Sequence, residues 1–174
     1  MYKMITLDMD GTLLNEDKVI STECKKAMHE AALQNKYVVI ATGRAISELE
    51  DYRQDFDDVS YIIGESGAVL YDWQKQCVVE KDCFEASDVE KIYALSNKQD
   101  IMIQWFKNGS AYVYEDQLRR LKDYEMGEYQ GLFNRTSNPI YDLDAFMEES
   151  KHDLEKMNFL KMAMPYQLHL LQEQ

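Results

Sequence analysis

Short apolar runs alternate with amphipathic segments over the first eighty residues, the pattern of strands that alternate with helices. Apolar and β-branched runs of this kind are typical of parallel strands buried on both faces. Ser21 is suited to cap a helix, and the apolar residues after it recur at i, i+3, i+4, i+7 and i+8. This half is predicted to be a parallel α/β unit. Its strands are predicted at Met4–Leu7, Tyr37–Ala41 and Tyr61–Ile63, with helices from Ser21 to about Gln34 and from the turn after Ala41 to about Tyr52.

The pattern changes near Lys81, after a predicted hairpin of Val69–Tyr71 and Cys77–Glu80. Beyond it, Asn108-Gly109 separates two apolar runs, a strong signal for a second hairpin. The later half is therefore predicted to be α+β, and we divide the chain into domains of residues 1–80 and 81–174. Helices are predicted at Ser87–Asn97, from Asp116 to about Lys122, at Leu143–Glu149 and from Pro165, strands at Ile101–Lys107, Ser110–Glu115 and Phe159–Met164, and irregular structure over Tyr124–Asn138.

The 174 residues carry a formal net charge of -13, which argues against a nucleic-acid partner because phosphate backbones attract Lys and Arg. No apolar run approaches the roughly 20 residues of a membrane span, and carboxylates interrupt the N-terminal apolar stretch. We expect no membrane partner and a cytoplasmic protein. Cys24, Cys77 and Cys83 lack metal-site spacing and are interpreted as free thiols in a reducing compartment. The sequence does not indicate an oligomeric state.

The candidate chemistry begins with Asp8 and Asp10, which follow the first apolar run and precede Gly11. On a regular strand the two carboxylates would point to the same side. Close carboxylates repel unless a cation neutralises them, and Mg²⁺ prefers oxygen ligands while leaving room for a phosphate. Asp8 is the candidate nucleophile of a phosphoryl transfer, and Asp10 the candidate general acid and base. The sequence thus predicts a Mg²⁺-dependent site for a small phosphorylated substrate.

A second turn, Thr42-Gly43-Arg44, follows the next predicted strand and should lie beside Asp8. The Thr42 hydroxyl and the amides that follow it, from Gly43 onward, could hold phosphate oxygens. Arg44 has two open interpretations, since it could contact the substrate or pair with a carboxylate.

These motifs resemble those of a known family. Asp8-Met9-Asp10-Gly11-Thr12-Leu13 is similar to the first motif of haloacid dehalogenase-superfamily phosphatases, and Ala41-Thr42-Gly43-Arg44 to the second motif of their Cof-like members. The resemblance implies a Rossmann-like α/β core, an inserted α+β cap of the C2 type, and a phosphatase that forms an aspartyl-phosphate. By the same resemblance, Thr42 binds phosphate, and Mg²⁺ is bound by Asp8 and the backbone carbonyl of Asp10. The substrate is expected to be a sugar phosphate.

Other parts of the family pattern are altered or missing. Ser66 stands where the family often has an asparagine near the substrate, so Ser66 is either a substrate-binding residue or part of a plain turn. The chain has no Gly-Asp dipeptide for the fourth motif, and its later lysines, such as Lys156, fall within the cap-like half. We expect that these residues belong to a larger polypeptide or are completed by another chain. Alone, they should form a weak or inactive phosphatase with an apolar sheet edge beside Asp8.

Two alternative functions remain open. A phosphomutase similar to eukaryotic phosphomannomutases would share this core and cap, and would convert a hexose 1-phosphate to the 6-phosphate instead of releasing phosphate. A non-catalytic phosphoacceptor would also use an aspartate, Mg²⁺ and a strand-end threonine. It would accumulate a long-lived phosphoprotein without turnover.

Overall fold

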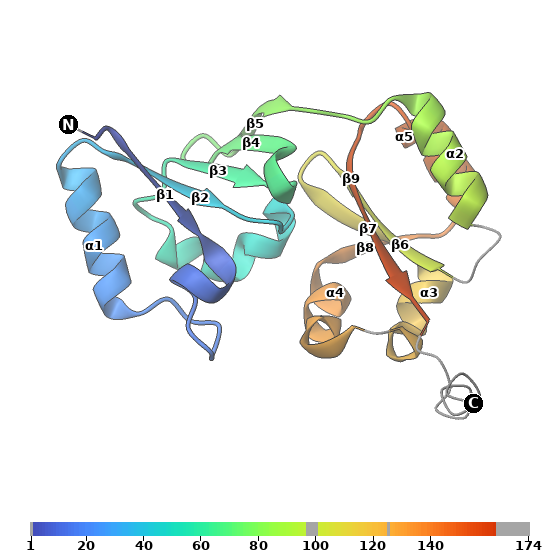
Figure 1. Cartoon of the computed structure of the whole chain (residues 1–174), viewed down its shortest axis with the longest axis horizontal. Coiled ribbons are helices and arrows are strands. Elements are labelled where there is room, and N and C mark those ends of the chain that lie inside the picture. Colours follow the sequence, from blue (N-terminus) through green and yellow to red (C-terminus); the bar gives the residue numbers. More distant parts are fainter. Residues whose placement is uncertain (1, 97–100, 125, 163–174) are drawn as a thin grey trace, which may run out of the picture.

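The computed structural model describes residues 2–96, 101–124 and 126–162, and these form two sheets that lie side by side (Figure 1). The first sheet has the order β1-β2-β3-β4-β5 and the second β8-β7-β6-β9. The strands are β1 (Met4–Asp8), β2 (Tyr37–Ala41), β3 (Tyr61–Gly64), β4 (Val69–Asp72), β5 (Cys77–Lys81), β6 (Ile101–Lys107), β7 (Ser110–Tyr114), β8 (Ser137–Ile140) and β9 (Leu154–Lys161). The α-helices are α1 (Thr22–Leu33), α2 (Ala86–Ser96), α3 (Glu115–Arg119), α4 (Gln130–Thr136) and α5 (Leu143–Ser150).

The first sheet confirms the predicted α/β arrangement. Strands β1, β2 and β3 are parallel, so their carboxyl ends meet at one edge of the sheet, and β4 and β5 extend it as an antiparallel hairpin. Helix α1 begins where predicted, because the Ser21 hydroxyl accepts a hydrogen bond of 3.1 Å from the backbone N–H of Cys24. It ends near Asn35, whose φ of 55° is the left-handed conformation expected after a helix.

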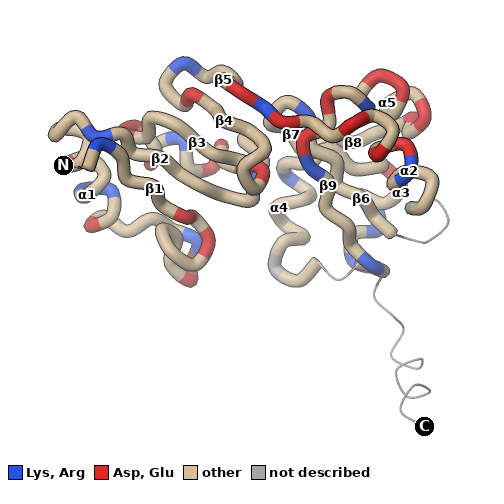
Figure 2. The backbone as a smooth tube through the Cα atoms, turned by 45° about the horizontal axis from the view of Figure 1, so that its top comes forward, with Lys and Arg blue, Asp and Glu red and all other residues tan. Residues whose placement is uncertain are grey.

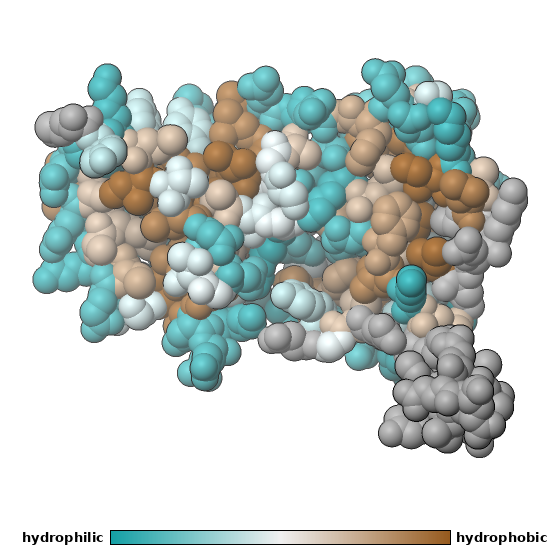
Figure 3. Space-filling model, in the orientation of Figure 1, coloured by the Kyte–Doolittle hydropathy of each residue, from teal (hydrophilic) through white to brown (hydrophobic). Residues whose placement is uncertain are grey.

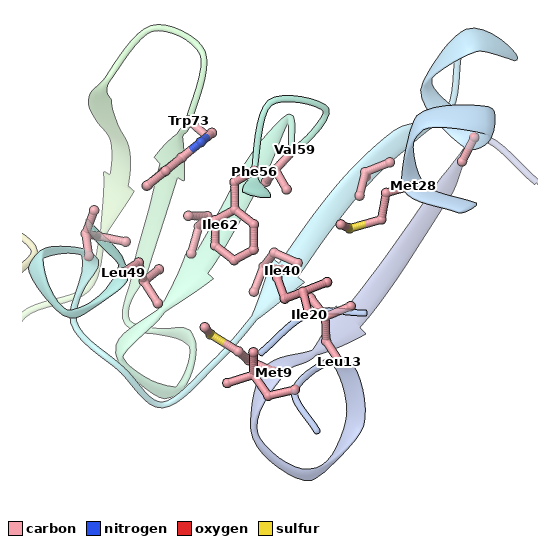
Figure 4. Packing of buried hydrophobic residues seen from close by; sticks show 14 of the residues in the cluster. Met9, Leu13, Ile20, Met28, Ile40, Leu49, Phe56, Val59, Ile62 and Trp73 are labelled. Atoms are coloured by element: carbon pink, nitrogen blue, oxygen red, sulfur yellow. The ribbon is translucent and has the colours of Figure 1, made fainter. Parts of the chain in front are cut away.

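An apolar cluster between the first sheet and its helices holds this half together (Figure 4). Ile40 of β2 and Ile62 of β3 are fully buried in it, as is Met9, which directly follows Asp8. Met9 therefore anchors the start of the turn that follows Asp8 and carries Asp10. Met9, Leu13, Ile20, Ile40, Phe56 and Ile62 are among the side chains drawn in Figure 4.

Strand β1 forms one edge of this sheet, and that edge is apolar and, within the described residues, unpaired. β1 pairs with β2 alone, and Met4 and Ile5 on it are 54% and 41% exposed. A hollow of about 190 Å³ between β1 and α1 is lined by Leu7, Met28 and other apolar side chains. Apolar residues are visible over this region in Figure 3. The described part of the chain thus has the expected apolar edge next to Asp8.

The second sheet is built on the predicted hairpin of β6 and β7. Asn108 and Gly109 both have positive φ, 51° and 76°, as the tight turn requires. Side chains of β6 alternate between the two faces of the sheet. Trp105 packs with α2 and α5, while Gln104 and Phe106 face the first unit.

Two secondary-structure predictions were wrong in part. Residues 124–138 were predicted to be irregular but include α4 and the first residues of β8. Helix α4 forms because Phe133 packs into an apolar cluster with β6 and β7. β8 is an edge strand, a position that tolerates its Pro139. β9 begins at Leu154, five residues earlier than predicted. Its first residues include polar ones that do not indicate a strand in the sequence, but they are held in the strand by pairing with β6. The helix after Arg44 is a 3-10 helix, Ile46–Asp55. The helix predicted from Pro165 lies outside the described residues.

The chain crosses from β5 to α2 over residues 82–85, near the predicted boundary (Figure 1). Acidic positions are frequent around α2 and α5 (Figure 2). The two units meet where the backbone N–H of Ser47 donates to the carbonyl of Gly109 at 2.9 Å, and where Ala45 packs against Phe106. No helix in the described ranges is long and apolar enough to cross a membrane.

Candidate active site

The site is built at the carboxyl end of β1. A tight turn over Met9–Leu13 follows Asp8, and Gly11 adopts the φ of 79° that a residue with a side chain would avoid. Asp8 is exposed, and one of its carboxylate oxygens accepts a hydrogen bond of 3.0 Å from the Thr12 hydroxyl. In the described part of the chain no cationic side chain pairs with Asp8. Its carboxylate is therefore accessible for contact with a ligand.

Asp10, in contrast, is bound by cations. The Arg44 Nε and Nη2 atoms each donate to one Asp10 oxygen at 2.8 Å, a bidentate ion pair, and Lys18 Nζ lies 3.7 Å from the same carboxylate. The hydrogen bonds from Arg44 are the main reason that the pKa of Asp10 is lowered. Arg44 was predicted either to contact the substrate or to pair with a carboxylate, and in the structure it pairs with the carboxylate of Asp10. Asp10 is held ionised in this conformation.

The second motif lies next to the first, as predicted from the parallel order of the strands. The Thr42 hydroxyl accepts from the backbone N–H of Arg44 at 3.2 Å, and the Thr42 carbonyl accepts from the backbone N–H of Ser66 at 3.1 Å. A Cβ added to Gly43 would lie 3.5 Å from the Ser66 hydroxyl oxygen. Ser66 has a φ of 63°, which a serine rarely adopts, and this brings its hydroxyl to the second motif. The predicted residues of three strand ends are therefore neighbours.

Lys156 is a residue of this site that the sequence interpretation assigned only to the cap-like half. It lies on β9, and its ammonium group donates to the carbonyl of Gly43 at 2.6 Å. The same group lies 5.0 Å from the centre of the Phe106 ring. Burial lowers the pKa of Lys156, while Glu48 and Glu65 oppose that effect. No local sequence signal could have found Lys156, because only sheet pairing turns it toward the other unit.

A β-bulge explains how β9 presents adjacent residues to the first unit. The register between β6 and β9 shifts at Phe106 and Lys107, beside Glu155. Glu155 accepts from the backbone N–H of Asn108 at 2.8 Å and from Lys81 Nζ at 3.2 Å.

Glu155 also faces Glu65, and the two form a buried carboxyl pair between the units. Both Glu65 oxygens and one Glu155 oxygen are buried and have no hydrogen-bond donor among the described residues. Burial, followed by the like charge of Glu155, raises the pKa of Glu65 to about 8. A proton on Glu65 that is donated to the unpaired Glu155 oxygen would pair two of these three oxygens, so Glu65 is expected to be protonated at neutral pH.

A cavity of about 520 Å³ opens beside these residues, between the two units. Asp10, Gly43 and Arg44 line its polar end, and the second unit contributes a mainly apolar lining. The cavity can therefore take a molecule with one polar end and a larger, partly apolar remainder. Its lining from the second unit includes Gln104, Met126, Tyr129, Phe133, Asn158 and Leu160.

The residues present match part of a magnesium site. Asp8 offers an exposed carboxylate, and Mg²⁺ is often bound by one or two carboxylates, several waters and a substrate phosphate. The described residues contain no group of three or more acidic, histidine or cysteine side chains that could hold a metal ion by themselves. Asp8 and the backbone carbonyl of Asp10 remain the candidate ligands.

Comparison with known proteins assigns the family. The family model of the haloacid dehalogenase-like hydrolases matches residues 5–167. The chain belongs to the haloacid dehalogenase-like hydrolases. The match includes both motifs that carry the resemblance, and the predicted family and fold class are confirmed.

Curated relatives of this haloacid dehalogenase-like chain carry phosphatase names. It is 34% identical over 98 residues to the 5-amino-6-(5-phospho-D-ribitylamino)uracil phosphatase YcsE of Bacillus subtilis, covering 56% of this chain and 39% of that protein. It is 25% identical over 157 residues to phosphatase YwpJ of the same organism, covering 90% and 53%. The chain spans about half the length of the curated relatives it matches, or less.

Solved structures show the same fold. A haloacid dehalogenase-like hydrolase from Bacteroides thetaiotaomicron superposes with a TM-score of 0.67 at 20% identity, covering 83% of this chain and 54% of that one. A sugar phosphatase of haloacid dehalogenase subclass IIB superposes with a TM-score of 0.65 at 20% identity, covering 90% and 58%. At this identity, the likeness concerns the fold.

Proposed function

We propose that the chain carries the nucleophile and phosphate-binding residues of a Mg²⁺-dependent phosphatase acting on small phosphorylated metabolites, with sugar phosphates as the expected class. The observation that carries this proposal is the meeting of the exposed Asp8 carboxylate, Thr42 and Ser66 at three adjacent strand ends. The cavity between the units has room for the rest of such a substrate. We further propose that residues 1–80 form the core and residues 81–174 a C2-type cap.

In the proposed reaction, an Asp8 carboxylate oxygen attacks phosphorus while the bond from phosphorus to the ester oxygen breaks. The products are an aspartyl-phosphate and an alcohol, and water then attacks phosphorus to release phosphate and restore Asp8. The Thr42 and Ser66 hydroxyls would orient phosphate oxygens. Mg²⁺, when bound by Asp8 and the Asp10 carbonyl, would offset the negative charge of the phosphate.

Asp10 would protonate the leaving alcohol and later accept a proton from water. To do so it must exchange its bidentate contact with Arg44 for contact with the substrate, because the ion pair keeps Asp10 deprotonated. We propose that Arg44 holds Asp10 in place until the substrate arrives. Lys156, at the carbonyl of Gly43, would add positive charge beside the phosphate from the cap side.

The test uses a substitution that leaves the shape of the nucleophile unchanged. In a polypeptide with phosphate-release activity that contains residues 1–174, Asp8→Asn should abolish Mg²⁺-dependent turnover. On residues 1–174 alone, binding of beryllium trifluoride, an aspartyl-phosphate mimic, should be seen by ¹⁹F NMR and should disappear in Asp8→Asn.

Asp17→Asn is the matched control, because Asp17 is an exposed aspartate in the loop that follows the site. It should keep both the turnover and the ¹⁹F signal. Full activity of the Asp8→Asn variant would exclude an aspartyl-phosphate on Asp8.

A further inference from the structure

A chain of side-chain hydrogen bonds runs from the second motif across to the cap sheet. The backbone N–H of Ala45 donates to Glu48 Oε2 at 2.8 Å, and Gln104 Nε2 donates to Glu48 Oε1 at 3.2 Å. Asn158 Nδ2 in turn donates to Gln104 Oε1 at 3.0 Å. Glu48 and Gln104 are only 5% and 1% exposed. These links cross from the 3-10 helix after Arg44 to β6 and then to β9.

The chemistry of this chain fixes the orientation of both amide groups. The Glu48 carboxylate accepts from Ala45 and from Gln104, so Gln104 must turn its NH₂ group toward Glu48. The carbonyl oxygen of Gln104 then faces Asn158, which must present its own NH₂ group. The reverse orientation of either amide would place two acceptors, or two donors, against each other and leave a buried group unpaired.

The remaining polar atom of the chain is the Asn158 carbonyl oxygen, Oδ1. Asn158 is half-buried and lines the cavity between the units. Within the described residues, Oδ1 accepts no hydrogen bond from the protein. Met126, Phe133 and Leu160 line the same cavity with apolar side chains. The cap side of the cavity therefore combines an oriented acceptor with apolar surface.

We propose that Asn158 determines substrate specificity by accepting a hydrogen bond from a hydroxyl or amine on the non-phosphate part of the substrate, and that Gln104 and Glu48 are positioning residues that hold Asn158 in the accepting orientation. The inference rests on the proposed phosphatase function and narrows its substrate class. A polyhydroxylated leaving group, such as a sugar or polyol, has both a hydroxyl donor and a C–H surface for the apolar residues.

Calorimetric binding to the purified chain in the presence of Mg²⁺ tests this without requiring turnover. The probes are inorganic phosphate, a hexose 6-phosphonate that cannot be hydrolysed, and the mono-deoxy analogues of that phosphonate. One deoxy analogue should bind about threefold to tenfold more weakly than the parent, the usual value of one neutral hydrogen bond. That penalty should fall below about twofold in Asn158→Leu, because the acceptor has been removed.

Gln104→Met separates a positioning role from simple contact, because it leaves Asn158 in place but frees its amide to turn. The deoxy penalty should fall in this variant too. Asn138→Leu is the matched control: Asn138 donates to the carbonyl of Ala111 on β7 and is not among the cavity-lining residues, so the penalty should persist.

The outcomes separate the two proposals. If the phosphonate binds but no deoxy analogue is weaker, or if the penalty persists in Asn158→Leu, the specificity role is wrong while the phosphatase proposal stands. A persistent penalty in Gln104→Met would refute the positioning role. If the phosphonate binds no more tightly than phosphate, the proposed substrate class, with a hydroxyl or amine donor on its non-phosphate part, is wrong. If neither probe binds, both proposals fail.

Discussion

The carboxyl pair between the two units leads to a prediction about stability and pH. Glu65 is 1% exposed, and its pKa is raised from an ordinary 4.5 to about 8 by burial and by Glu155. Below pH 4.5, Glu65 is protonated in both the folded and the unfolded chain, so this residue adds no pH dependence to the free energy of unfolding there. Between pH 4.5 and about 8, the unfolded chain releases the proton while the folded chain retains it. The free energy of unfolding should therefore fall as pH rises through this range.

Glu65→Gln removes this ionisation and supplies an NH₂ donor for the buried Glu155 oxygen that has none. The gap between 4.5 and about 8 corresponds to an upper value of about 5 kcal/mol, at about 1.4 kcal/mol for each pH unit. Because partial relaxation around the carboxyl pair would reduce this cost, we expect the variant to be about 2–5 kcal/mol more stable than the wild type at pH 8. The advantage should shrink steadily toward pH 5.

Urea unfolding at pH 5, 6, 7 and 8, followed by tryptophan fluorescence, measures this difference. Trp73 and Trp105 are both buried, one in each unit, so the signal reports on both. Glu80→Gln is the control, since Glu80 is an exposed glutamate on β5 and its loss should change stability little at any pH. A Glu65→Gln variant that is no more stable than the wild type at pH 8, or whose advantage does not grow with pH, would refute the reasoning.

Two further predictions follow from single contacts. Arg44→Met removes the bidentate partner of Asp10, so the pKa of Asp10 should rise, as measured by ¹³C NMR of its carboxyl carbon. The control is Arg53→Met, which breaks the exposed ion pair with Glu50 and should leave the pKa of Asp10 unchanged. An unchanged Asp10 pKa in Arg44→Met would contradict the assigned cause. Ser21→Ala removes the cap of α1 and should lower the free energy of unfolding by about 1 kcal/mol in urea titrations, whereas Ser21→Asp, which can still cap, should lower it less.

Local patterns in the sequence were sufficient for most of the first unit and for one hairpin of the second. The apolar runs of β1, β2 and β3, the cap at Ser21 and the Asn108-Gly109 hairpin depend on neighbouring residues, so their physical causes can be read along the chain. The site residues at the ends of β1 and β2 could also be placed together in advance, because parallel strands bring their carboxyl ends to the same edge. Ser66 joined them only as an open alternative, and its positive φ is what brings its hydroxyl to Gly43.

The contributions of the second unit to the site were decided by tertiary structure. Lys156 and Asn158 lie on β9. The first residues of β9 include polar ones, so the sequence pattern did not indicate where the strand begins, and its register is set by pairing with β6. A bulge then turns Glu155 toward Glu65, ninety residues earlier in the chain. Contacts over such separations have no local signature, because their energy comes from burial and from partners that only the folded chain brings together. The sequence by itself thus determined the family, the first unit and the predicted nucleophile, while the folded structure decided which residues of the second unit line the cavity.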